Sequence, residues 1–119
     1  MPEWSDVGIL LSLKPHGENN IIVSMLTSKN GRHLGLVKTY KRLKRNGELE
    51  KGNIVNAIWY ARLIDQLGIL NLEIKKNIFA NIIDDPLKLI SITSMCEILE
   101  TILPEREPNQ KLWVSTIAL

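Results

Sequence analysis

IIVSMLTSKNGRHLGLVK, residues 21–38, is the stretch that decides the fold of this chain. Ile21 to Thr27 form a β-branched run with the period of a half-buried strand. Asn30-Gly31 in the turn that follows can supply the positive φ angles of a tight hairpin. Residues 32–38 are therefore expected to form the next strand and to pair with the first.

Three further stretches have the pattern of strands. Residues 7–13, 54–62 and 69–74 each alternate apolar side chains with others along the chain. Five short strands with a long connection, residues 39–52, after the third predict a mainly β fold. The predicted fold is a five-stranded Greek-key barrel of the oligonucleotide-binding (OB) type. An SH3-like barrel is the alternative that the same pattern allows.

The period changes towards the C-terminus. Asp85 followed by Pro86 offers an N-cap and a proline in the first turn, and apolar residues then recur at helical spacing as far as Leu103. A second helix is predicted from about Asn109 to the last residue, where it stops in mid-period. We therefore expect an OB barrel in residues 1–80 and, in residues 81–119, the truncated start of a helical domain, with one complete and one truncated helix.

The composition is that of an ordinary globular protein and excludes several classes. The chain has 119 residues, of which 45% are hydrophobic and 24% charged. Its one cysteine, Cys96, cannot form an internal disulfide or a multi-cysteine zinc site and is expected to be a buried apolar residue. We find no signal peptide, no apolar run that could span a membrane, no catalytic triad and no P-loop. A cytoplasmic protein without enzymatic activity, cofactor or metal is expected.

The positive charge is concentrated in one part of the chain. Residues 29–51 contain eight cations and two carboxylates and carry +6, whereas the remaining residues together carry −4. A row of cations can neutralise successive phosphates and release their counterions, and aromatic side chains can stack on bases. The same run also fits a merely solvated loop.

Aromatic residues lie in and near this basic run. Trp59 and Tyr60 are adjacent on a predicted strand and therefore point to opposite faces. Trp59 shares its face with Val55 and Ala57, which favours burial, whereas Tyr60 is a candidate for base stacking. The predicted nucleic-acid-binding residues are Arg32, His33, Lys38, Tyr40, Lys41, Arg42, Lys44, Arg45, Tyr60 and Arg62.

A family resemblance is carried by several short motifs in a fixed order. They are WSDVGILL (4–11), HGE (16–18), LT (26–27), GRH (31–33), GLV (35–37), GN (52–53), WYARL (59–63), LG (67–68), Glu73 and LPEREP (103–108). In their order and spacing these motifs resemble RecO, the bacterial recombination mediator family. The resemblance covers essentially the whole chain.

The resemblance implies both a fold and a function. RecO-like proteins have an N-terminal OB barrel followed by a helical domain, and they have no known catalytic centre. They bind single- and double-stranded DNA, anneal strands covered by single-strand-binding protein, and work with RecR to load RecA. Many hold zinc with four cysteines in the later helical region, which this chain does not offer. The family's docking of single-strand-binding protein also uses the helical part.

Two other functions remain open from the sequence. The barrel could be an interaction adaptor that docks a RecR-like partner, with the basic segment only assisting. It could also be an RNA-binding module, because stacking platforms accept either sugar.

Overall fold

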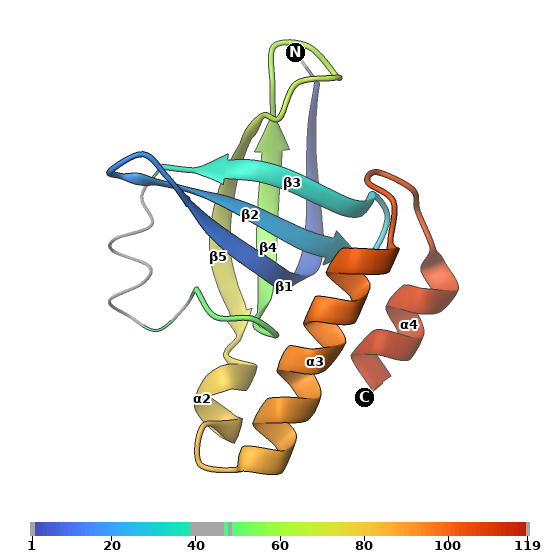
Figure 1. Cartoon of the computed structure of the whole chain (residues 1–119). Helices are drawn as coiled ribbons and strands as arrows, with labels where there is room; N and C mark the ends of the chain where they lie inside the picture. Colours follow the sequence, from blue (N-terminus) through green and yellow to red (C-terminus); the bar gives the residue numbers. More distant parts are fainter. Residues whose placement is uncertain (1, 39–46, 48, 119) are drawn as a thin grey trace.

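The computed structural model describes residues 2–38, 47 and 49–118. Its first part is a closed barrel with the strand order β1-β2-β3-β5-β4 (Figure 1). The strands are β1 (Glu3–His16), β2 (Asn20–Thr27), β3 (Gly31–Val37), β4 (Ile54–Tyr60) and β5 (Ile69–Lys76). All neighbours are antiparallel except β3 and β5, which meet in parallel at Leu36 and Ile69. This arrangement confirms the prediction of a five-stranded barrel and fits the OB type.

β1 is twice as long as the alternation at 7–13 predicts, because it pairs with two strands. Its C-terminal part, from Gly8, pairs with β2, and its N-terminal part, as far as Ile9, pairs with β4. A β-bulge between Leu10 and Ser12 changes the register where β1 passes from one neighbour to the other. One continuous strand thereby contributes to two sides of the barrel.

The barrel interior is filled by apolar side chains from all five strands. Trp59 is fully buried in this interior, as its shared face with Val55 and Ala57 predicts. Gly68 in the β4–β5 loop allows close packing against the Trp59 indole. It has a φ of +77°, and a Cβ there would lie 2.3 Å from Nε1 of that ring.

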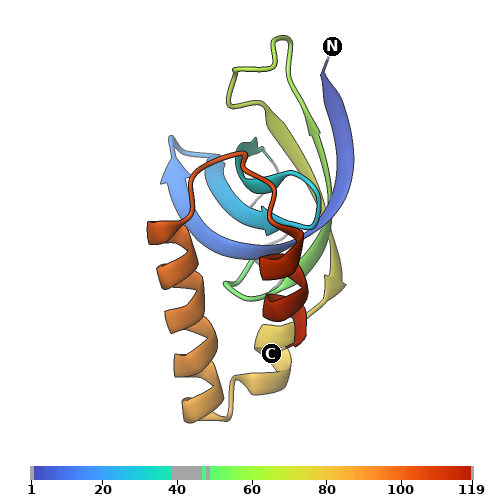
Figure 2. The same cartoon turned by 90° about the vertical axis from the view of Figure 1, so that its right-hand side faces the viewer.

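Three helices follow the barrel: α2 (Ile78–Ile82), α3 (Pro86–Ile102) and α4 (Gln110–Ala118) (Figure 2). Asp85 caps α3 as predicted, since its side chain accepts a hydrogen bond from the Lys88 amide at 3.2 Å. The Asn109 side chain accepts one from the Leu112 amide at 3.0 Å, so α4 begins where the sequence places it. The short α2 was not predicted, because five residues are too few to show a helical period.

α3 is held against the barrel by a second apolar cluster. Cys96 and Leu99 of α3 pack on Ile9, Leu11 and Leu26 of the barrel, and Cys96 is fully buried there, as expected. No helix in the described ranges is long and apolar enough to cross a lipid bilayer.

Candidate nucleic-acid interface

A row of outward-facing side chains crosses the barrel surface. Lys14 lies opposite Ile22, Ile22 opposite Leu36, Leu36 opposite Ile69, and Ile69 opposite Tyr60. Directly paired residues share a face of the sheet, so these five side chains form a continuous band, which we call the outer row. Lys14 is exposed and the other four are half-buried. The outer row is therefore a partly accessible apolar and aromatic strip with a cation at one end.

The Tyr60 end of the outer row opens into a shallow cavity of about 450 Å³, which we call the β4–β5 pocket. Its lining consists of Leu36, Tyr60, Ala61, Arg62, Gln66, Leu67, Gly68 and Ile69. Arg62 is exposed, and Tyr60 is half-buried. An aromatic ring and a guanidinium thus line one apolar cavity, a combination that suits a nucleobase and its phosphate.

Lys38 extends the cationic border of this surface. It is exposed and lies two residues beyond Leu36 of the outer row. Lys38 also begins the basic segment, whose other predicted binding residues lie outside the described residues. These are Tyr40, Lys41, Arg42, Lys44 and Arg45.

Arg32 does not face solvent but joins the barrel to α3. Its guanidinium lies 2.7 Å from the Glu100 carboxylate, and Nε donates a hydrogen bond to the Leu103 carbonyl at 2.8 Å. A further bond, at 3.3 Å, reaches the Ser24 hydroxyl. The predicted role in phosphate binding does not fit this placement, because the charge is already compensated between the barrel and the helix.

His33 lies inside the barrel and is only 4% exposed. Its ring packs edge-on between Trp4 and Trp59, at centroid distances of 5.0 and 4.7 Å. Burial, with a smaller contribution from the nearby charge of Arg106, lowers the pKa of His33 to about 4. The imidazole is therefore neutral at physiological pH and inaccessible to DNA, so it does not belong to the binding surface that the sequence predicts.

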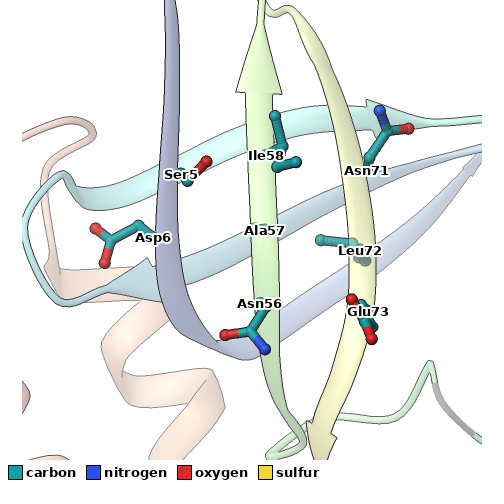
Figure 3. Close-up of a pocket in the computed structure, with 8 residues that line it drawn as sticks. All are labelled: Ser5, Asp6, Asn56, Ala57, Ile58, Asn71, Leu72 and Glu73. Carbon is teal, nitrogen blue, oxygen red and sulfur yellow. The ribbon is translucent and has the colours of Figure 1, made fainter.

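A second surface cavity, of about 590 Å³, lies on β1, β4 and β5 and has a different character. It is lined by Ser5, Asp6, Asn56, Ala57, Ile58, Asn71, Leu72 and Glu73, which include two carboxylates and no cation (Figure 3). Figure 3 shows the carboxylate of Asp6 pointing away from β4. Phosphate binding is disfavoured on this face by its charge.

The Asp6 carboxylate is bound into the β2–β3 turn. It accepts hydrogen bonds from the Ser28 hydroxyl, the Lys29 amide at 2.9 Å and the Asn30 side chain at 2.9 Å. Burial acts to raise the pKa of Asp6, but these bonds and one from the Val7 amide outweigh it, so that the pKa lies below its usual value. Asp6 is thus ionised at neutral pH.

Comparison with known proteins identifies the family. The family model described as "Recombination protein O N terminal" matches residues 1–77. The chain belongs to the RecO family. This confirms the resemblance seen in the sequence motifs.

Curated relatives of this RecO-family chain carry the name "DNA repair protein RecO". The relative from Rhodospirillum centenum is 44% identical over 98% of this chain and 47% of its own length. The relative from Rhodospirillum rubrum is 40% identical over 100% of this chain and 47% of its own length. One from Cereibacter sphaeroides is 37% identical over 100% of this chain and 50% of its own length. The chain spans about half the length of these relatives. The name that these relatives carry denotes DNA repair.

Sequence reasoning missed two contributors to the surface of this RecO-family chain. Lys14 lies just beyond the predicted strand at 7–13, although it continues β1 and faces Ile22 across the sheet. Arg106 was quoted only within a motif, whereas its guanidinium contacts the β4–β5 loop. The burial of His33 was detectable, because it alternates with Leu34 and shares its face with Gly35 and Val37, both of which are buried.

Proposed function

We propose that this RecO-family chain binds single- and double-stranded DNA through the outer row, the β4–β5 pocket and the adjoining basic segment. The observation that carries the proposal is the continuous apolar and aromatic outer row, bordered by the exposed cations Lys14, Lys38 and Arg62. Bases can stack on Tyr60, while the cations neutralise the phosphates on either side. The basic segment, residues 38–51, contains six cations against two carboxylates and adds a local charge of +4.

The proposed activity is strand annealing in recombinational repair, and it needs no catalytic group. A cationic surface that holds two strands close lowers their mutual repulsion, and base pairing then supplies the specificity. In the cytoplasm, associated with the nucleoid, the chain would work with RecR and single-strand-binding protein in the loading of RecA. The names of the relatives, which denote DNA repair, support this setting.

The salt dependence of DNA binding tests the electrostatic part. Fluorescence anisotropy of a labelled single-stranded oligonucleotide is measured at several salt concentrations for the wild type and for the variant Lys41→Ala, Arg42→Ala, Lys44→Ala, Arg45→Ala. If these four cations each contact a phosphate, the slope of log K against log salt is less negative by about 3 in the variant than in the wild type, and the remaining slope comes from cations such as Lys14, Lys38 and Arg62. Annealing of complementary oligonucleotides should collapse together with binding.

A charge-matched control separates a local effect from a general one. Lys75, Lys76, Lys88 and Lys111 are exposed and lie away from the outer row, and their replacement by alanine removes the same charge. This control should retain most of the affinity and the annealing activity. Equal losses in the two variants would show non-specific attraction, and retained annealing by the basic-segment variant would overturn the proposal.

Tyr60 tests the stacking part. Tyr60→Ala should weaken binding of single-stranded DNA by about 1–3 kcal/mol, the usual value of one stacked base, without changing the salt slope. Ile58→Ala is the matched control, because Ile58 faces outward on the same strand, is 43% exposed and lines the acidic cavity. Equal affinities of Tyr60→Ala and Ile58→Ala would exclude a base on Tyr60.

A protein-docking adaptor is the second candidate function. The observation in its favour is the exposed apolar tip of the β4–β5 loop, where Leu63 is 61% and Ile64 65% exposed. An adaptor would bind a RecR-like partner with unchanged affinity when the four basic-segment residues are replaced. Leu63→Ser with Ile64→Ser would abolish that binding and leave the salt slope of DNA binding intact.

Competition between DNA and RNA tests the third function that the sequence left open. Unlabelled RNA of the same sequence should displace the labelled DNA less effectively than unlabelled DNA does. Preferential displacement by RNA would favour an RNA-binding module.

A further inference from the structure

Arg106, in the connector between α3 and α4, reaches the β4–β5 loop forty residues away in the sequence. One terminal nitrogen donates a hydrogen bond to the Gln66 carbonyl at 2.6 Å, and the other donates to the Ile64 carbonyl. The guanidinium carbon also lies 5.2 Å from the ring centroid of Trp59, in the range of a cation–π contact. Both terminal nitrogens of the charged group are thus bonded to the β4–β5 loop.

The backbone of the connector is fixed in the same place. The Arg106 amide donates to the Arg32 carbonyl at 2.6 Å, and Glu105 forms a parallel bridge with Arg32. Arg106 has a φ of 60°, an uncommon value for a residue other than glycine. Surrounding contacts must stabilise such a conformation, so the position of this guanidinium is imposed by the connector.

The loop that Arg106 holds is the one that forms the β4–β5 pocket. Gln66 lines the pocket, and its side-chain oxygen accepts hydrogen bonds from the Arg62 and Leu63 amides, both at 3.1 Å. At the other end of the loop, the Gly68 carbonyl accepts from the amide of Leu36, a member of the outer row, at 3.0 Å. A displacement at Gln66 therefore changes the placement of Arg62 and the shape of the pocket.

We propose that Arg106 is a positioning residue: it fixes the β4–β5 loop beside the outer row and so makes DNA affinity depend on the connector between α3 and α4. This inference rests on the proposed DNA-binding function. The proposal assigns Arg106 no contact with DNA, because both terminal nitrogens donate to loop carbonyls and the guanidinium lies over the indole of Trp59. Arg106 instead raises the fraction of molecules in which the β4–β5 loop has its DNA-binding conformation.

The test compares Arg106→Gln and Arg106→Lys with two controls in the full chain. Arg62→Gln removes a cation that is proposed to contact phosphate, and Lys111→Gln removes an exposed charge from α4. DNA affinity and salt slope are measured by anisotropy with a labelled single-stranded oligonucleotide. Loop order is measured separately by NMR as the hydrogen-exchange rate of the Trp59 indole N–H, which donates to the Leu67 carbonyl at 2.8 Å.

Replacing Arg106 should change the DNA affinity without changing the slope of log K against log salt. Arg106→Gln should lower affinity by about fivefold with an unchanged slope and should accelerate exchange of the Trp59 indole, because the loop-competent fraction falls. Arg106→Lys keeps the positive charge but loses the two-pronged hydrogen bonding of the guanidinium. Its DNA affinity and indole exchange rate should lie between those of Arg106→Gln and the wild type. This variant decides the test if Arg106→Gln does not fold. Arg62→Gln should make the slope less negative by about 0.7, and Lys111→Gln should change little.

Two results would overturn the proposal. Unchanged affinity and unchanged indole exchange in both Arg106 variants would mean that the loop is held without this residue. A slope shifted as in Arg62→Gln would mean that Arg106 contacts phosphate directly. If the wild type itself does not bind DNA, the proposed function fails, and indole exchange alone then decides whether Arg106 orders the loop.

Discussion

The imidazole of His33 meets the indole of Trp59 edge to face inside the barrel, with ring centroids 4.7 Å apart. Neither ring nitrogen of His33 has a hydrogen-bond partner among the described residues. A buried imidazole without a partner cannot easily accept a proton, which is why its pKa falls to about 4. An ionisable group thereby serves as a packing residue.

This burial makes stability depend on pH. His33 is protonated near pH 6.5 in the unfolded chain but only near pH 4 in the folded one, so unfolding takes up a proton between these values. The contribution of His33 is fully present above pH 6.5 and is lost as the pH falls towards 4. We expect the free energy of unfolding to fall by up to about 3 kcal/mol over this window, measured by urea denaturation.

A control isolates His33 from other titrating groups. His33→Leu is close in volume and cannot titrate, so it should remove most of the fall between pH 6.5 and pH 4. His16→Leu, at the exposed last residue of β1, should leave the fall unchanged. The same pH profile in His33→Leu and the wild type would show that other groups cause the dependence.

Gly31 is expected to be intolerant of a side chain. It has a φ of +69°, and a Cβ there would lie 2.4 Å from the carbonyl oxygen of Glu107 in the α3–α4 connector. Gly17 has a similar φ, +73°, but no atom within 4 Å of its Cβ position. Gly17→Ala should therefore cost about 1 kcal/mol of stability from backbone strain, and Gly31→Ala at least about 2 kcal/mol more from the collision. Equal melting temperatures of the two variants would contradict this.

Glu100 should be the carboxylate of α3 that matters most for attaching the helix. Its pair with Arg32 is largely buried, with side-chain exposures of 25% and 12%. Glu100→Gln leaves the guanidinium without its counter-charge and should cost about 2 kcal/mol in urea denaturation. Glu97→Gln, one turn earlier in an exposed pair with Lys51 at 3.6 Å, should cost less than about 0.5 kcal/mol. Similar losses would argue against a special role of the buried pair.

Cys96 can report the detachment of α3. Burial raises the pKa of its thiol to about 11, and the residue is fully buried against the barrel. At pH 8 only about one molecule in a thousand carries the thiolate, so a thiol reagent should react very slowly with the native protein. The rate should rise with urea in parallel with unfolding. A fast reaction without denaturant would show that α3 leaves the barrel frequently.

The sequence predicted the barrel well because its signals were local. The alternation along Ile21 to Thr27 depends only on neighbours, and so does the turn at residues 28–30, although Gly31 alone of the Asn30-Gly31 pair has the expected positive φ. The cap at Asp85 likewise acts within one turn. The full length of β1 could not be read, since it depends on pairing with β4, which lies far along the chain. The residue pattern of β1 alone does not indicate this non-local pairing.

The surroundings of the predicted site residues were harder to foresee than the fold. The positive charge of Arg32 made it a predicted phosphate ligand. Only the packing of α3 shows that its guanidinium already forms an ion pair with Glu100. Tyr60 was placed outward correctly by alternation with Trp59. The outer row could not be assembled, because joining Lys14 to Tyr60 requires the register between all five strands.

The split pairing of β1 also determines when the barrel can form on the ribosome. Glu3 to Ile9 find their partners only at Ile54 to Tyr60, about fifty residues later in synthesis. At typical translation rates the first strand therefore waits roughly 3–10 seconds for its neighbour to emerge. In that interval its N-terminal half is an unpaired edge beside a finished hairpin. The nascent chain thus exposes this edge to chaperones and to self-association until β4 arrives and pairs with it, and β5 closes the ring later by joining β3 to β4.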